Sequence, residues 1–131
     1  EKGKFYLFVK SSPNPDNLLL LVSDHVNGKF ERVEGFDDSM GAQTKGMYEA
    51  PTAVKLADGR WCLFADFYGA GCAGQGYVPF VSDDLTKGVF TRADEAFHFP
   101  YGFKHGTILP ITEEEYERML ARDWTDVPDL R

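Results

Sequence analysis

The sequence predicts an all-β protein built as part of a β-propeller, about two to three blades, with one short C-terminal helix. The main observation is an internal repeat: residues 3–9 (GKFYLFV) match residues 59–65 (GRWCLFA) at an offset of 56. A second pair of segments, residues 22–33 and 81–93, matches at an offset of 59 to 60. Repeats of about 40 to 60 residues built from short strands are typical of propeller blades.

The strands are expected where aromatic and β-branched residues cluster between turn residues. The first matched pair predicts strands at residues 5–10 and 61–66, each preceded by a turn glycine. Further strands are expected at residues 18–23, 29–33, 53–56, 76–82 and 89–93. Asp58 and Gly59 predict a tight hairpin turn. We therefore divide the single domain, residues 1–131, into repeat units at about 3–50 and 51–100 and a closing segment at 101–131.

Helix is expected only at residues 112–122, where Thr112 and Glu115 have the spacing of a capping box. Three apolar residues with helical spacing predict one stripe that faces the rest of the protein: Tyr116, Met119 and Leu120. Residues 35–44 are expected to form a connection between the repeats. Its carboxylates, Asp37 and Asp38, are expected to be solvated.

Composition excludes several classes of function. The chain has 131 residues and a net charge of −7, so it lacks the basic surplus that nucleic-acid binding requires. No apolar run approaches the roughly 18 residues of a membrane span. The two cysteines cannot form a disulfide framework, and we expect Cys62 to be buried and Cys72 to lie in a loop. The unpaired cysteines and the absence of a leader favour the cytoplasm, although the compartment stays open.

Two and a half blades do not close a ring, because propellers have about 4 to 8 blades and an open set leaves sheet edges exposed. We therefore expect either that the N-terminal half of the propeller is missing from this chain or that a homo-oligomer completes the ring.

Glu49 is the candidate for acid chemistry. It lies between Tyr48 and the Ala50-Pro51 pair, just before the predicted inner strand of the second repeat. Inner strands of a propeller begin around the central channel, so a partly desolvated carboxyl group there would favour its protonated form and suit a general acid. The alternative is an ordinary loop glutamate that caps a backbone N–H group.

Three other residues are candidates for the pocket. His105, followed by Gly106, would reach the channel floor as a hydrogen-bond donor or metal ligand, or else be a structural histidine. Asp66 ends a predicted strand, where it would contact a sugar or cap a turn. Trp61 is expected to belong to the core, or else to stack on a sugar ring.

The ordered motifs at residues 48–52, 59–64, 82–85 and 104–107 resemble those of glycoside hydrolase family 43. These enzymes are five-bladed β-propellers and include β-xylosidases, α-L-arabinofuranosidases and arabinanases. The resemblance implies that Glu49 is the general acid and that His105 lies on the pocket floor, near where some members hold calcium. No cofactor would be required, and calcium is left open. Ala50 stands where the family motif has glycine.

The resemblance also implies that two aspartates, the base among them, would lie upstream of Glu1. The implied function is inverting exo-hydrolysis of xylose- or arabinose-containing polysaccharide, in a half-propeller that lacks its base. A second interpretation is a non-catalytic carbohydrate-binding or scaffold half-propeller that oligomerises. A third is a kelch-like protein-interaction propeller. Sequence does not separate xylose from arabinose, or exo from endo action.

Overall fold

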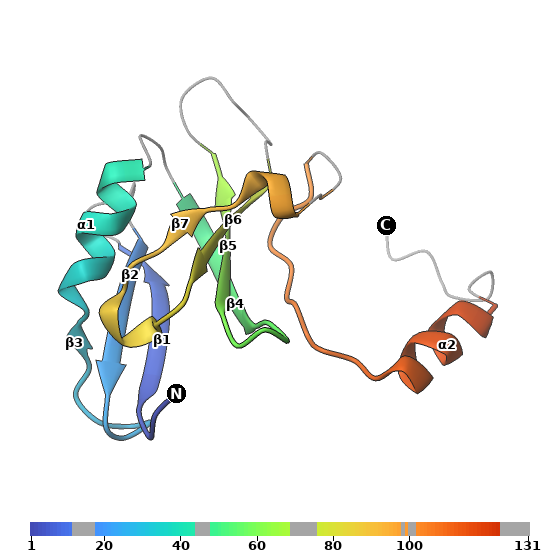
Figure 1. Ribbon diagram of the computed structural model, residues 1–131, viewed down its shortest axis with the longest axis horizontal. Helices are drawn as coiled ribbons and strands as arrows, with labels where there is room; N and C mark the ends of the chain where they lie inside the picture. The colour runs from blue at the N-terminus through green and yellow to red at the C-terminus, as the bar shows by residue number, and fades with distance from the viewer. Residues whose placement is uncertain (12–17, 44–47, 69–75, 98, 100–101, 124–131) are drawn as a thin grey trace.

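The computed structural model describes residues 1–11, 18–43, 48–68, 76–97, 99 and 102–123, and within them the chain forms two antiparallel sheets (Figure 1). The first sheet has the order β1 (Phe5–Lys10), β2 (Leu18–Ser23) and β3 (Glu31–Arg32). The second has the order β4 (Tyr48–Lys55), β5 (Trp61–Phe67), β6 (Gly76–Ser82) and β7 (Thr91–Arg92). The helices are α1 (Glu34–Gln43), α2 (Glu113–Ala121) and the short 3₁₀ helices η1 (Leu85–Lys87) and η2 (Asp94–Ala96).

The strand order reproduces the sequence repeat. Strands β1, β2 and β3 follow one another as β5, β6 and β7 do, and β1 and β5 contain the matched segments at residues 3–9 and 59–65. The mostly β architecture is therefore confirmed, although the outer strands β3 and β7 are only two residues long. In the second sheet β4 pairs with the edge of β5 that faces away from β6, whereas in the described part of the chain no strand pairs with the equivalent edge of β1.

Helix α1 corrects the prediction of an irregular connection at residues 35–44. Its sequence, EGFDDSMGAQ, holds two glycines and few strong helix formers, so local propensity does not predict it. The helix forms because Phe36 and Met40, one turn apart, are both buried against the core. Asp38 is exposed, as expected, whereas Asp37 is half-buried and forms an ion pair with Arg32.

Three aromatic rings join the two sheets. Phe8 of β1, Phe36 of α1 and Phe90 pack edge to face, with centroids 5.5 to 5.9 Å apart. Next to them, the Ser39 hydroxyl donates to the Phe90 carbonyl and accepts from the Phe90 N–H group, both at 2.8 Å. The first repeat is thereby fixed to the outer part of the second.

Two glycines allow helix α1 to lie close to the backbone at the end of η1. A Cβ atom at Gly88 would lie 2.7 Å from the Phe36 nitrogen, and Gly88 has a φ of +67°. A Cβ atom at Gly35 would collide with the Lys87 carbonyl oxygen. Helix α1 therefore approaches the backbone after η1 more closely than side chains would allow.

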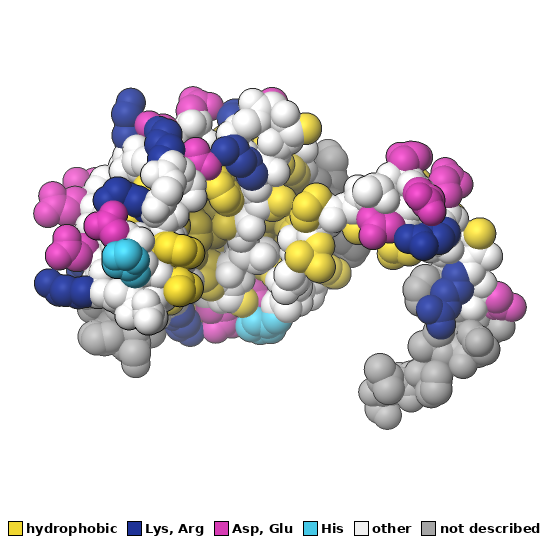
Figure 2. Space-filling view, turned by 90° about the horizontal axis from the view of Figure 1, so that it is seen from below, with side chains coloured by type: hydrophobic (Ala, Val, Ile, Leu, Met, Phe, Trp, Pro, Cys, Tyr) yellow, Lys and Arg dark blue, Asp and Glu magenta, His cyan; other side chains and the backbone are white. Residues whose placement is uncertain are grey.

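Helix α2 begins with the predicted capping box, but its apolar stripe does not pack as predicted. Thr112 and Glu115 form the capping box, with hydrogen bonds in both directions. The apolar stripe, however, does not face the protein: Tyr116, Met119 and Leu120 are 47%, 49% and 62% exposed. The helix stands apart from the sheets at the end of an extended segment, as Figures 1 and 2 show. No helix in the described ranges is long and apolar enough to cross a bilayer.

The expected buried cysteine is confirmed. Cys62 is fully buried, and burial raises the pKa of its thiol to about 12. Cys72 lies outside the described residues.

We predict that Phe90→Ala lowers the free energy of unfolding by about 3–5 kcal/mol, because it removes a fully buried ring from the aromatic contact between the sheets. Urea denaturation followed by circular dichroism measures this loss. Val89→Ala is the matched control, since Val89 is 56% exposed and its truncation should cost less than about 0.5 kcal/mol. Equal losses in the two variants would contradict this account of the core.

Candidate functional site

The candidate site lies where β4 begins and β5 ends. In the antiparallel register Glu49 is the direct partner of Asp66, and Tyr48 is the partner of Phe67. The register then shifts between Glu49 and Thr52. This irregularity contains Ala50, whose φ of +46° lies in the left-handed region. Irregularities of this kind redirect side chains, and here the Glu49 side chain is left 26% exposed.

Asp66 fixes the position of His105. Its side chain is fully buried, and its Oδ2 atom accepts the backbone N–H of His105 at 2.9 Å and lies 3.4 Å from the His105 Nδ1 atom. The Oδ1 atom has no hydrogen-bond partner among the described residues. His105 has a φ of +50°, a left-handed conformation that histidine adopts more readily than most residues. Its imidazole is 60% exposed, so one face stays accessible.

An aromatic cluster supports the chain around His105. Tyr77 donates its hydroxyl hydrogen to the Gly106 carbonyl, and its ring contacts Phe103 and Phe99. A Cβ atom at Gly76 would lie 2.8 Å from the Phe103 carbonyl oxygen, so glycine there lets the segment pass close to β6. The position of His105 is thus set by packing as well as by Asp66.

Lys10, at the end of β1, contacts this cluster from the first sheet. Its Nζ atom lies 3.0 Å from the Glu49 Oε2 atom and 4.5 Å from the centroid of the Tyr68 ring. Interaction with Tyr68 first, and with Glu49 second, raises the pKa of Lys10. The ammonium group therefore stays charged throughout the neutral range.

Glu49 is the centre of this arrangement. Lys10 binds its Oε2 atom, while the His105 Nε2 atom lies 3.8 Å from its Oε1 atom. Lys10, Glu49, His105 and Asp66 thus form a row that combines one cation, two carboxyl groups and an imidazole, drawn from both sheets and the C-terminal segment. A carboxyl group placed between a lysine and an exposed histidine has partners for hydrogen bonding and proton transfer, which suits acid–base chemistry.

Trp61 is not part of this cluster. It pairs with Lys55 at the opposite end of β5, five residues from Asp66 or roughly 16 Å along the strand. The Lys55 ammonium lies 5.7 Å from the Trp61 ring. There Trp61 lines a hollow of about 310 Å³ together with residues that include Phe5 and Tyr6. Trp61 therefore lies away from Glu49, and its contact with a sugar stays a prediction.

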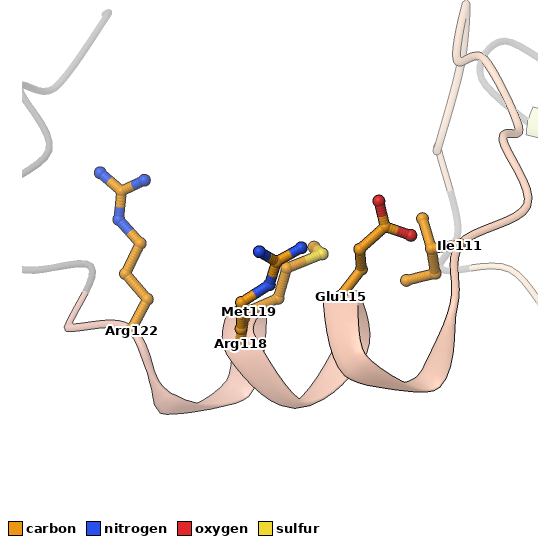
Figure 3. Close-up of a pocket in the computed structure, with 5 residues that line it drawn as sticks. All are labelled: Ile111, Glu115, Arg118, Met119 and Arg122. Carbon is orange, nitrogen blue, oxygen red and sulfur yellow. The ribbon is translucent and has the colours of Figure 1, made fainter.

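A second hollow, of about 350 Å³, lies on α2, away from Glu49. Figure 3 shows the side chains that line it: Ile111, Glu115, Arg118, Met119 and Arg122. None of these residues belongs to the row around Glu49.

The described residues offer little to a metal ion. Among them, no three histidine, cysteine or acidic side chains gather as ligands. Calcium takes about 6 to 8 oxygen ligands, and around His105 the described carboxyl groups are those of Glu49 and Asp66, already engaged with Lys10 and His105. This donor set does not fit a calcium site.

Comparison with known proteins gives the family. Residues 1–117 match a family described as a probable glycosyl hydrolase domain, which is related to glycoside hydrolase family 43. The chain belongs to this family. Its resemblance to family 43, inferred from motifs, is thereby confirmed. Comparisons with curated proteins and with solved structures gave no match.

Within this family 43-related domain, the structure brings together three of the four residues that the sequence indicates: Glu49, Asp66 and His105. Lys10 is an addition that no motif predicts. The internal repeat could have indicated Lys10, because the offset of 56 makes it the counterpart of Asp66. Lys10 at the end of β1 and Asp66 near the end of β5 both contact this cluster.

We predict that Ala50→Gly stabilises the domain by about 0.5–1 kcal/mol. Glycine removes a left-handed strain of about 1–2 kcal/mol, which outweighs the greater freedom of glycine in the unfolded chain, about 0.5–1 kcal/mol. Chemical denaturation measures the change. Ala53→Gly, in the regular part of the same strand, is the control and should destabilise. A loss of stability in both variants would show that Ala50 is not strained.

Proposed function

We propose that the chain is part of an inverting glycoside hydrolase that removes xylose or arabinose units from xylan-type polysaccharides, with Glu49 as the general acid. The observation that carries the proposal is the placement of Glu49, half-buried between a lysine and an exposed histidine, in a chain of the glycosyl hydrolase family. Such a carboxyl group would protonate the glycosidic oxygen as the bond to the sugar C1 atom breaks.

The base would come from outside the described cluster. An inverting enzyme needs a second carboxylate about 6.5 to 9.5 Å from the acid, with room for a water molecule between them. Asp66 does not meet this need, because it is fully buried and accepts hydrogen from the His105 backbone. We infer that an N-terminal segment or a second copy of the chain supplies the base.

The internal repeat supports the inference that another segment or a second copy of the chain supplies the base. In the second sheet β4 pairs with β5 and carries Glu49 opposite Asp66. The equivalent edge of β1, which ends at Lys10, has no partner strand among the described residues. A strand added there would complete the blade in the manner of β4, and residues at its start would lie beside Lys10. The complete assembly would be a five-bladed propeller.

His105 would contact the sugar. Its imidazole is 60% exposed, yet its backbone is fixed by Asp66 and its Nε2 atom faces Glu49. A hydrogen bond from this ring to a sugar hydroxyl would hold the glycosidic oxygen near the acid. Orientation of this kind contributes strongly to rate, since it replaces an encounter in solution with a fixed geometry.

We predict that the chain cleaves phenyl β-xyloside or phenyl α-L-arabinofuranoside in the presence of azide. Azide takes the place of the water that the base would activate and attacks C1, while the C1–oxygen bond breaks and the Glu49 proton goes to the phenolate oxygen. The products are glycosyl azide and phenol. Glu49→Gln should lower this rate by about 10²–10⁴-fold, because the poor leaving group then departs without a proton.

The controls separate acid catalysis from other effects. A 2,4-dinitrophenyl glycoside needs no acid, so Glu49→Gln should cleave it at nearly the wild-type rate. Glu31→Gln changes an exposed carboxylate that pairs with Lys29 and should leave both rates unchanged. Equal loss with both leaving groups would contradict the role of Glu49. An absence of cleavage by the wild-type chain, together with sugar binding, would indicate a carbohydrate-binding module instead.

A further inference from the structure

Lys10 lies where it can act on the candidate acid. It ends β1, on the other sheet from Glu49, and its ammonium group is confined between the Glu49 Oε2 atom at 3.0 Å and the Tyr68 ring at 4.5 Å. The Lys10 side chain is 37% exposed and the Glu49 side chain 26%, so the pair is partly shielded from water. Such a bond is stronger than one on an open surface.

The two oxygens of Glu49 have different neighbours. The ammonium group of Lys10 has only hydrogens to give, so the Oε2 atom that it contacts must act as an acceptor. The Oε1 atom lies 3.8 Å from the Nε2 atom of the exposed His105 imidazole. This separation is too long for a hydrogen bond, so Oε1 can still bind a substrate oxygen. With Oε2 engaged by the ammonium group, Oε1 is the oxygen from which Glu49 can give a proton to a substrate.

We propose that Lys10 is a positioning residue, which fixes the Glu49 carboxyl group through Oε2 and thereby directs the proton on Oε1 toward the leaving group. This inference rests on the proposed function. When the proton leaves, the negative charge that develops on Glu49 lies beside a fixed cation. The cation thus stabilises the transition state more than the protonated ground state.

The other groups that face Glu49 do not replace this effect. Asp66 of β5 is a carboxyl group engaged with His105, and His105 approaches the opposite oxygen. Tyr68, which follows β5, contacts the lysine through its ring. Among the described residues packed against Glu49, Lys10 is therefore the permanent positive charge.

The first test follows the Lys10 ammonium group directly, by carbon and nitrogen NMR of labelled lysine across the alkaline range. Interaction with Tyr68 first, and with Glu49 second, raises the pKa of Lys10, so Glu49→Gln should lower the pH at which Lys10 titrates. Lys4, paired with Asp24 just before the start of β1, is the internal reference and should not move. Glu31→Gln should leave Lys10 unchanged. Identical Lys10 titration in the wild-type chain and Glu49→Gln would overturn the proposal.

The second test measures azide-assisted cleavage of the phenyl and 2,4-dinitrophenyl glycosides. Lys10→Met should lower the rate with the phenyl glycoside roughly tenfold and leave the rate with the dinitrophenyl glycoside nearly unchanged, because only the phenyl leaving group needs the proton that Lys10 directs. Lys10→Arg should restore most of the rate. Lys29→Met, which removes an exposed lysine, is the matched control.

The two proposals fail in different ways. An equal rate loss in Lys10→Met with both leaving groups, and no rescue by arginine, would reduce Lys10 to a structural residue while Glu49 kept its role. Normal coupling between Lys10 and Glu49 without any cleavage would instead refute the proposed hydrolysis, and the positioning role with it.

Discussion

In the antiparallel pair of β4 and β5, Glu49 lies opposite Asp66, and the approach of Glu49 to Lys10 and His105 depends on that register. A slip of one residue would turn each side chain of β4 to the opposite face of the sheet. Asp66 would then still hold the His105 backbone, but no carboxyl group would face the imidazole. The hydrogen bonds of the sheet thus place an acid and a histidine that are 56 residues apart in sequence.

The placement of the two sheets against each other is maintained by packing at some distance from the site. The edge-to-face rings of Phe8, Phe36 and Phe90, together with the two hydrogen bonds of Ser39, join the sheets. Because β1 and β4 belong to different sheets, the Lys10–Glu49 bond depends on this junction. Its geometry is set by a core that contains neither residue.

Strands β1 and β5 could be predicted because each leaves a local pattern: a turn glycine, then a short aromatic run, repeated at an offset of 56. Helix α1 could not, because its stability comes from the burial of Phe36 and Met40 rather than from helix-forming residues. The capping box of α2 is likewise local and predictable, whereas the exposure of Tyr116 and Leu120 depends on where the preceding segment leads. Glu49, Asp66 and His105 are recognisable through motifs. Lys10 carries no motif, and its role follows from the position of β1 in space.

Gly35 and Gly88 are constrained by backbone geometry alone, since a methyl group at either would collide with main-chain atoms of the neighbouring element. Neither lies among the residues that form the candidate site. Substitutions can therefore act on the two sets separately. A change at Glu49 would remove the candidate acid and leave both glycines in place, whereas a side chain at either glycine would disturb the junction between the sheets and, with it, the Lys10–Glu49 bond. The two glycines serve the architecture of this chain, and Glu49 and His105 are the candidates for its chemistry.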